Sequence, residues 1–214
     1  MFVAKMEDVL DVYTRPFDGA YPVVCVDEAR KELHSTPRGA LPVEAGQPRR
    51  EDYVYERHGT ANIFVSVEPL SGKRRIRITD RHTKLDFAEE IRCILEEDYP
   101  EAKKVVLVTD NLNTHGLHAL YEAFEPEQAG RLARRLEWHF TPEHASWLNI
   151  AEIELSALST QCLGGRVESR DVLETRVKHW ENERNTRQVR IDWQFRSEDA
   201  RIKLRRLYPR YKSA

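Results

Sequence analysis

Acidic residues that follow two apolar segments could together bind a metal ion. Asp27 directly follows the apolar residues 23–26, and Asp110 comes two positions after the apolar residues 105–108. In an α/β sheet, side chains at strand ends face the crevice in which ligands bind, and paired strands lie about 4.8 Å apart. Carboxylates placed so closely repel each other unless a cation lies between them. Oxygen ligands select hard cations, so the pattern predicts Mg²⁺ or Mn²⁺ rather than zinc.

A third carboxylate should come from the helix predicted to start near Asn149. Glu152 and Glu154 are both candidates, but at about 100° per residue they point roughly 160° apart and cannot face the same ion. Glu154 falls in the apolar sector of the helix, whereas Glu152 lies on the polar side with Asn149. Asn149 and Glu152 also match a capping box, in which the glutamate would only accept a backbone N–H. The residues alone leave the choice open.

The elements that must position these acids can be read from the hydrophobic pattern. Continuous or alternating apolar residues predict strands, and apolar residues at helical spacing predict helices. Strands are expected at 21–27, 61–67, 74–79, 104–109 and 136–140. Helices are expected at 6–13, from 83 onward, at 115–124, at 149–161, after a Ser169 cap and after a Ser197 cap. Residues 29–58 are rich in Pro and Gly and are predicted to form a loop or a loose hairpin.

A hairpin followed by strand–helix units predicts an α/β fold with a mixed five-stranded sheet flanked by helices. This is the element order of an RNase H-like fold. We expect residues 1–20 to be a short helical lead-in, residues 21–163 to be the core, and residues 164–214 to be a C-terminal helical extension.

Charge and composition limit the possible functions further. Residues 161–214 hold 14 Lys and Arg against 8 Asp and Glu, so this +6 tail leaves a charge of −8 for the rest of a chain whose net charge is −2. An acidic first part and a basic tail suit a metal site beside a surface that binds a polyanion. No apolar run approaches the length of a membrane span, and the three scattered cysteines predict neither a disulfide framework nor a zinc site. A cytoplasmic protein is expected.

Three segments of the chain each contain one of the candidate acids. They are Val-Cys-Val-Asp-Glu at 24–28, Asp-Asn-Leu-Asn-Thr-His at 110–115, and Thr-Pro-Glu-His-Ala-Ser-Trp-Leu-Asn-Ile-Ala-Glu at 141–152. These segments resemble the acidic motifs of the bacterial insertion-sequence transposases related to mariner elements. The tail, with Trp180, Trp193 and the segment 199–201, also resembles the C-terminal end of that family. The likeness runs from about residue 6 to residue 209. Many relatives have Pro where Ile150 stands, and residues 125–131 look like extra length.

The resemblance implies a transposase catalytic domain of the DDE type. Asp27, Asp110 and Glu152 match the acidic triad, which favours Glu152 over Glu154 as the third ligand. Two Mg²⁺ or Mn²⁺ ions would support cleavage of transposon-end DNA and strand transfer. A homodimer assembled on DNA and a nucleoid-associated location are implied by analogy. Relatives usually carry helix-turn-helix domains before the catalytic part, and only about twenty residues precede the first strand here, so we expect a catalytic core without that domain.

Basic residues near the acids are candidate DNA contacts. They are Lys31, Arg38, Arg49 and Arg50 on the predicted loop, His115 after the second acid, and Arg201, Lys203, Arg205 and Arg206 in the tail. Two other functions fit the same residues. One is a different RNase H-like nuclease, such as a ribonuclease or a junction resolvase. The other is a truncated DNA-binding remnant without catalytic activity.

Overall fold

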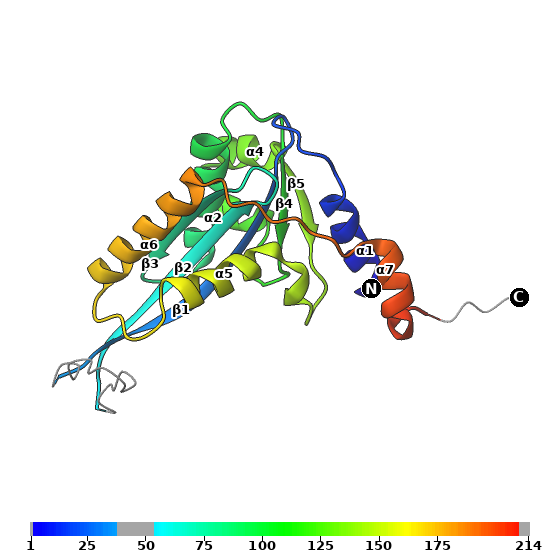
Figure 1. Ribbon diagram of the computed structural model, residues 1–214. Coiled ribbons are helices and arrows are strands. Elements are labelled where there is room, and N and C mark those ends of the chain that lie inside the picture. Colours follow the sequence, from blue (N-terminus) through cyan, green and yellow to red (C-terminus); the bar gives the residue numbers. More distant parts are fainter. Residues whose placement is uncertain (1, 38–53, 210–214) are drawn as a thin grey trace, which may run out of the picture.

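The computed structural model describes residues 2–37 and 54–209, which form a mixed sheet covered by helices on both faces (Figure 1). The strands are β1 (Val23–Ser35), β2 (Glu56–Glu68), β3 (Lys73–Thr79), β4 (Val105–Thr109) and β5 (Leu136–Phe140). The helices are α1 (Phe2–Tyr13), α2 (Lys84–Cys93), α3 (Leu117–Ala123), α4 (Pro126–Arg134), α5 (Ile150–Gln161), α6 (Arg170–Thr186) and α7 (Ser197–Lys203). Within these residues, no helix has the length and apolar character that a membrane span requires.

The strand order is β3-β2-β1-β4-β5, with β1, β2 and β3 antiparallel and β1, β4 and β5 parallel. The predicted mixed five-stranded sheet, flanked by helices and followed by a helical C-terminal part, is therefore confirmed. Cys25 on β1 lies opposite Val108 on β4. Asp27 and Asp110 each follow their member of this pair by two residues, so the register brings both acids to the same end of neighbouring strands.

Alternation along the strands divides the apolar core between the two faces of the sheet. Val24 and Val26 face a cluster built with α2, α3 and α4. Cys25 faces the opposite cluster, which contains apolar residues of α1 and the start of α5. Further along this second face, α5 and α6 cover β2. Asp27 has the same parity as Cys25, so its side chain points to the α5 face.

The region between the first two strands differs from the prediction of a loop or loose hairpin over residues 29–58. β1 continues to Ser35 and β2 begins at Glu56, so a long two-stranded antiparallel arm extends from the sheet (Figure 1), with an irregular register between Glu32 and His34. The arm lacks the apolar pattern of a core strand because most of its residues are polar and are partly or fully exposed. Its end, residues 38–53, lies outside the described residues.

Two further details concern the helices. Residues 125–131, which look like extra length beside the family that the sequence resembles, belong mostly to α4, which begins with Pro126. Proline suits the first position of a helix because the N–H that it lacks would have no partner there. The last helix is capped by Arg196 rather than by Ser197, which is its first helical residue.

The exposed edge of the sheet at β3 is covered by side chains of α6. Asn185 accepts a hydrogen bond from Arg74 N at 2.9 Å and donates to Arg74 O at 2.8 Å. Glu181 accepts from Ile76 N at 3.2 Å, and Arg170 donates to Ile78 O at 3.1 Å. One helix thus satisfies the backbone groups that a neighbouring strand would otherwise bind.

Candidate active site

Asp27 is the most buried of the three predicted ligands, with 7% of its surface exposed. Its Oδ1 accepts a hydrogen bond from Glu28 N at 2.8 Å, and its Oδ2 accepts one from Asn149 Nδ2 at 3.0 Å. The pKa of Asp27 is raised to about 7. Burial is the main cause, the hydrogen bond from Glu28 N opposes it, and the negative charges of Glu152, Glu28 and Asp110 add to it. The group lies in a place where a positive charge would stabilise it.

Asp110 follows β4 and is tied to a buried histidine. Its Oδ1 lies 2.5 Å from His115 Nδ1, while His115 Nε2 lies 3.1 Å from Glu28 Oε2. The imidazole ring stacks on Phe87 with 4.2 Å between ring centroids. Burial alone would lower the pKa of His115, but the two carboxylates raise it to about 9. The ring therefore lies between two carboxylates, with a hydrogen bond to Asp110 and an ion-pair contact to Glu28.

The position of His115 bears on its predicted contact with DNA. Its side chain is only 1% exposed. In this structure His115 therefore contacts the carboxylates, and its ring is not presented at the surface for a nucleic acid.

Glu152 lies in the first turn of α5, whose N-terminus is capped by Asn149 Oδ1, the acceptor from Ala151 N at 3.1 Å. The Glu152 carboxylate has no hydrogen-bond partner among the described residues, so the capping box that the sequence allowed is not formed. Burial raises the pKa of Glu152, and the charges of Asp110 and Glu28 add to this effect. The carboxylate is thus close enough to the other acids to be repelled by them.

Glu154 has a different environment from Glu152. Its side chain is fully buried, and its two oxygens lie 3.2 Å from Arg74 Nε and 2.9 Å from Arg184 Nη2. The structure therefore places the alternative third ligand in an ion-pair cluster between α5, β3 and α6. It brings Asp27, Asp110 and Glu152 together, and it does not bring Glu154 to them.

Most of the basic residues that were predicted to contact DNA either have a partner within the protein or lie outside the described residues. Lys31 Nζ donates to Leu163 O at 3.1 Å, which ties the β1 arm to the segment after α5. Arg201 is paired with Glu7 at 2.8 Å. Lys203 Nζ lies 4.0 Å from Asp199. Three further candidates, Arg38, Arg49 and Arg50, lie outside the described residues, whereas Arg205 and Arg206 are exposed.

The chemistry of this donor set fits a hard divalent cation, since all the clustered ligands are carboxylate oxygens. Burial is the main cause of the raised pKa of Asp27, and the neighbouring carboxylates add to it, so a cation here would favour the ionised form of Asp27. Over residues 2–37 and 54–209, however, no three His, Cys, Asp or Glu side chains converge on one position that could hold a metal ion. The acids are near enough to influence one another's pKa values.

Comparison with known proteins identifies the family. A family profile described as DDE superfamily endonuclease matches residues 22–174, most of the chain and all three acids. The chain belongs to this family. No curated protein matches the chain.

Several solved structures are similar in fold to this DDE superfamily member. The Mos1 mariner paired end complex with Mn has a TM-score of 0.57 and 16% identity, covering 87% of this chain and 56% of that chain. The Mos1 Strand Transfer Complex has a TM-score of 0.58 and 15% identity over the same shares of both chains. At this identity the likeness shows the RNase H-like fold alone. The chain spans less than two thirds of the length of these neighbours.

Two residues of the site were not assigned a role from the sequence. Glu28, next to Asp27, shares His115 with Asp110. Asn149 was recognised only as a possible helix cap, yet it also binds Asp27. Its apolar neighbours Leu148 and Ile150 are signals that could have indicated a buried amide.

Proposed function

We propose that this chain is the catalytic domain of a cut-and-paste DNA transposase of the insertion-sequence type. It would cleave transposon-end DNA and join it to a target, with Asp27, Asp110 and Glu152 as the metal-binding carboxylates. The observation that carries the proposal is the pairing of β1 with β4, which sets Asp27 and Asp110 at one end of the sheet. Membership of the DDE superfamily endonuclease family supports the same assignment.

The chain's own residues would bind and orient the reacting groups. Two Mg²⁺ or Mn²⁺ ions, when bound, activate the attacking hydroxyl and stabilise the leaving oxygen at phosphorus. Asp27 and Asp110 would hold the ions from the sheet, and Glu152 would hold them from α5. His115 would orient Asp110 through a hydrogen bond and Glu28 through an ion-pair contact. Pairing of two transposon ends would bring two copies of the chain together on DNA.

A ribonuclease or resolvase on the same fold would need the same acids, so strand transfer decides between these functions. We expect the chain to nick supercoiled plasmid DNA in Mg²⁺ or Mn²⁺ and to join an oligonucleotide with a free 3′-hydroxyl to that plasmid. Asp110→Ala should abolish both reactions, because one group of metal ligands serves both displacements. Asp18→Asn, an exposed acid before β1, is the matched control and should retain both.

Each result has a definite reading. Nicking without joining, lost in Asp110→Ala, would assign a nuclease rather than a transposase. Nicking that survives Asp110→Ala would exclude the proposed site. Metal-independent DNA binding without either reaction would identify a non-catalytic remnant.

A further inference from the structure

We infer that Asn149 is a positioning residue that fixes the distance and orientation between Asp27 and Glu152, and that Tyr13 holds Asn149 in place from α1. This inference rests on the proposed function, because it concerns the metal ligands proposed there. It assigns a role to a buried amide and a partly buried phenol that the reaction itself does not consume.

Asn149 is fully buried, and its amide has partners on both atoms. Nδ2 donates to Val26 O at 2.9 Å and to Asp27 Oδ2 at 3.0 Å. Oδ1 accepts from Ala151 N at 3.1 Å. The partners fix which atom is which, since Ala151 N can only donate and Val26 O can only accept. One side chain therefore links the backbone of β1, a carboxylate of the site and the first turn of α5.

This link determines how the ligands meet. Glu152 lies three residues after Asn149 in the helix that this cap begins, so anchoring Asn149 on Asp27 also anchors the start of Glu152's helix. Asp27 accepts one hydrogen bond on each oxygen. A carboxylate has about four lone-pair positions, so both oxygens keep a free position for a cation. Partners of this kind orient a metal ligand, and their loss typically costs about 10–100-fold in metal affinity or activity.

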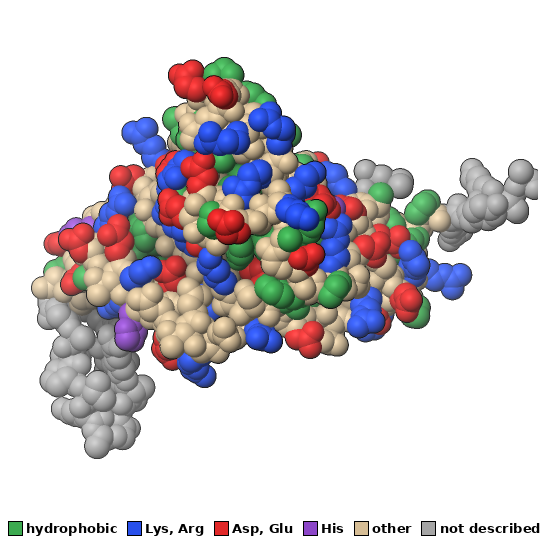
Figure 2. All heavy atoms as spheres, turned by 90° about the horizontal axis from the view of Figure 1, so that it is seen from above, with side chains coloured by type: hydrophobic (Ala, Val, Ile, Leu, Met, Phe, Trp, Pro, Cys, Tyr) green, Lys and Arg blue, Asp and Glu red, His purple; other side chains and the backbone are tan. Residues whose placement is uncertain are grey.

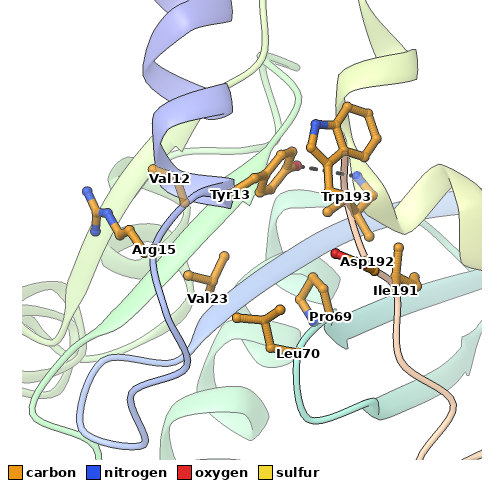
Figure 3. A pocket seen from close by; sticks show the side chains of 10 residues that line it. Val12, Tyr13, Arg15, Val23, Pro69, Leu70, Ile191, Asp192 and Trp193 are labelled. Atoms are coloured by element: carbon orange, nitrogen blue, oxygen red, sulfur yellow. Dashed lines mark hydrogen bonds between the residues drawn. The ribbon is translucent and has the colours of Figure 1, made fainter. Parts of the chain in front are cut away.

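Tyr13 supplies the second link, from the last residue of α1. Its hydroxyl donates to Leu148 O at 2.7 Å and accepts from Ile150 N at 3.4 Å, the dashed line in Figure 3. These two backbone groups flank Asn149 on either side. The Tyr13 ring packs against Trp193 of the C-terminal segment, with 5.3 Å between centroids, and the two residues lie together in Figure 3. The lead-in helix and the tail thus both support the loop that carries Asn149.

Mn²⁺ binding tests the inference without relying on turnover. Asn149→Ser keeps a good helix cap but is too short to keep the bond to Asp27. We expect it to weaken Mn²⁺ binding about tenfold or more by calorimetry, and to raise the Mn²⁺ concentration for half-maximal nicking equally, with activity partly recovered in excess Mn²⁺. Tyr13→Phe should shift both values in the same direction by less. Asn62→Ser, which removes a buried amide bonded to Asp80 O, should leave both unchanged.

The outcomes separate this inference from the proposed function. If the unaltered chain binds Mn²⁺ and cuts DNA while folded Asn149→Ser does so with the same Mn²⁺ dependence, Asn149 is only a cap and the inference is wrong. If Asn149→Ser and Asn62→Ser weaken binding alike, the effect is general destabilisation and the inference is also wrong. If the unaltered chain itself neither binds Mn²⁺ nor cuts DNA, the proposed function has failed instead. Should Asn149→Ser not fold, Tyr13→Phe alone decides between a shifted and an unshifted Mn²⁺ dependence.

Discussion

Two buried groups of the carboxylate cluster have pKa values displaced in the direction that makes the metal-free protein sensitive to alkali. Asp27 has a folded pKa of about 7 against 3.8 in a free side chain, and His115 has about 9 against 6.5. Each of these two side chains holds its proton more tightly in the folded protein than in the unfolded chain. The stability that each group contributes is therefore complete below its unfolded pKa and is lost as pH rises through its folded pKa.

We expect the melting temperature in EDTA to fall as pH rises from 5 to 9. Asp27 accounts for the loss up to about pH 7, and His115 for the loss that continues toward pH 9. Asp27→Asn should remove the first part and leave the second. Saturating Mg²⁺ should flatten the first part, because it favours the ionised carboxylate. A melting temperature that is level from pH 5 to 9 in EDTA would contradict these pKa shifts.

At the scale of elements, α5 carries two glutamates with different surroundings and different contacts. Glu152 faces the acids of the sheet, whereas Glu154 joins the helix to β3 through Arg74 and to α6 through Arg184. Removing one partner from a buried ion pair leaves an uncompensated charge, at a cost of about 3–5 kcal/mol. The helix is thus held by one glutamate so that the other can be presented to the site.

Paired substitutions on α5 should separate these roles. We expect Glu154→Gln to lower the free energy of unfolding by about 3 kcal/mol in urea titration, with Mn²⁺ still bound by the folded fraction. Glu152→Gln should leave stability unchanged or slightly higher, because it removes a repelled charge, while abolishing Mn²⁺-dependent nicking. Loss of Mn²⁺ binding in folded Glu154→Gln, with binding retained in Glu152→Gln, would reverse the assignment of the third ligand.

The same elements show how far the sequence determines fold and site. The strand β4 was predicted nearly to the residue, because burial on both faces leaves a continuous apolar run. The strand β5 was predicted at its observed bounds although its apolar residues alternate with Glu137 and His139. The outer half of β1 was not, since strands that protrude beyond the core need no apolar residues. The choice between Glu152 and Glu154 depended on Arg74 and Arg184, which are distant in sequence. Helical periodicity on α5 could not reveal those two cations.

At the scale of the whole molecule, charge is distributed unevenly along the chain but is mixed on the face that Figure 2 shows. The face turned upward in Figure 1 carries intermixed basic and acidic side chains (Figure 2). Within residues 54–209, Arg205 and Arg206 near the C-terminal end are exposed and have no side-chain partner, in contrast to Arg201, which Glu7 holds. Among the four tail residues predicted to contact DNA, these two have no ion-pair partner within the described part of the chain.

If DNA contacts this end of the molecule, Arg205 and Arg206 should contribute to the salt dependence of the affinity of the protein for DNA. Each phosphate contact contributes about 0.9 to the slope of log affinity against log salt concentration. We expect the double variant Arg205→Gln and Arg206→Gln to reduce that slope by nearly two in fluorescence-anisotropy titrations with duplex DNA. Lys103→Gln with Lys104→Gln, an equally exposed basic pair just before β4, is the control. Equal reductions in both double variants would indicate general electrostatic attraction rather than contact at the tail.

The covering of β3 by α6 also limits how copies of this chain can associate. An open sheet edge is a template on which foreign strands add, and such addition is the first step toward fibrous aggregates. Here the backbone groups of β3 already bind side chains of α6, namely Arg170, Glu181 and Asn185. Two copies brought together on DNA would have to meet through other surfaces, because a strand can be added at β3 only after α6 has moved away from it.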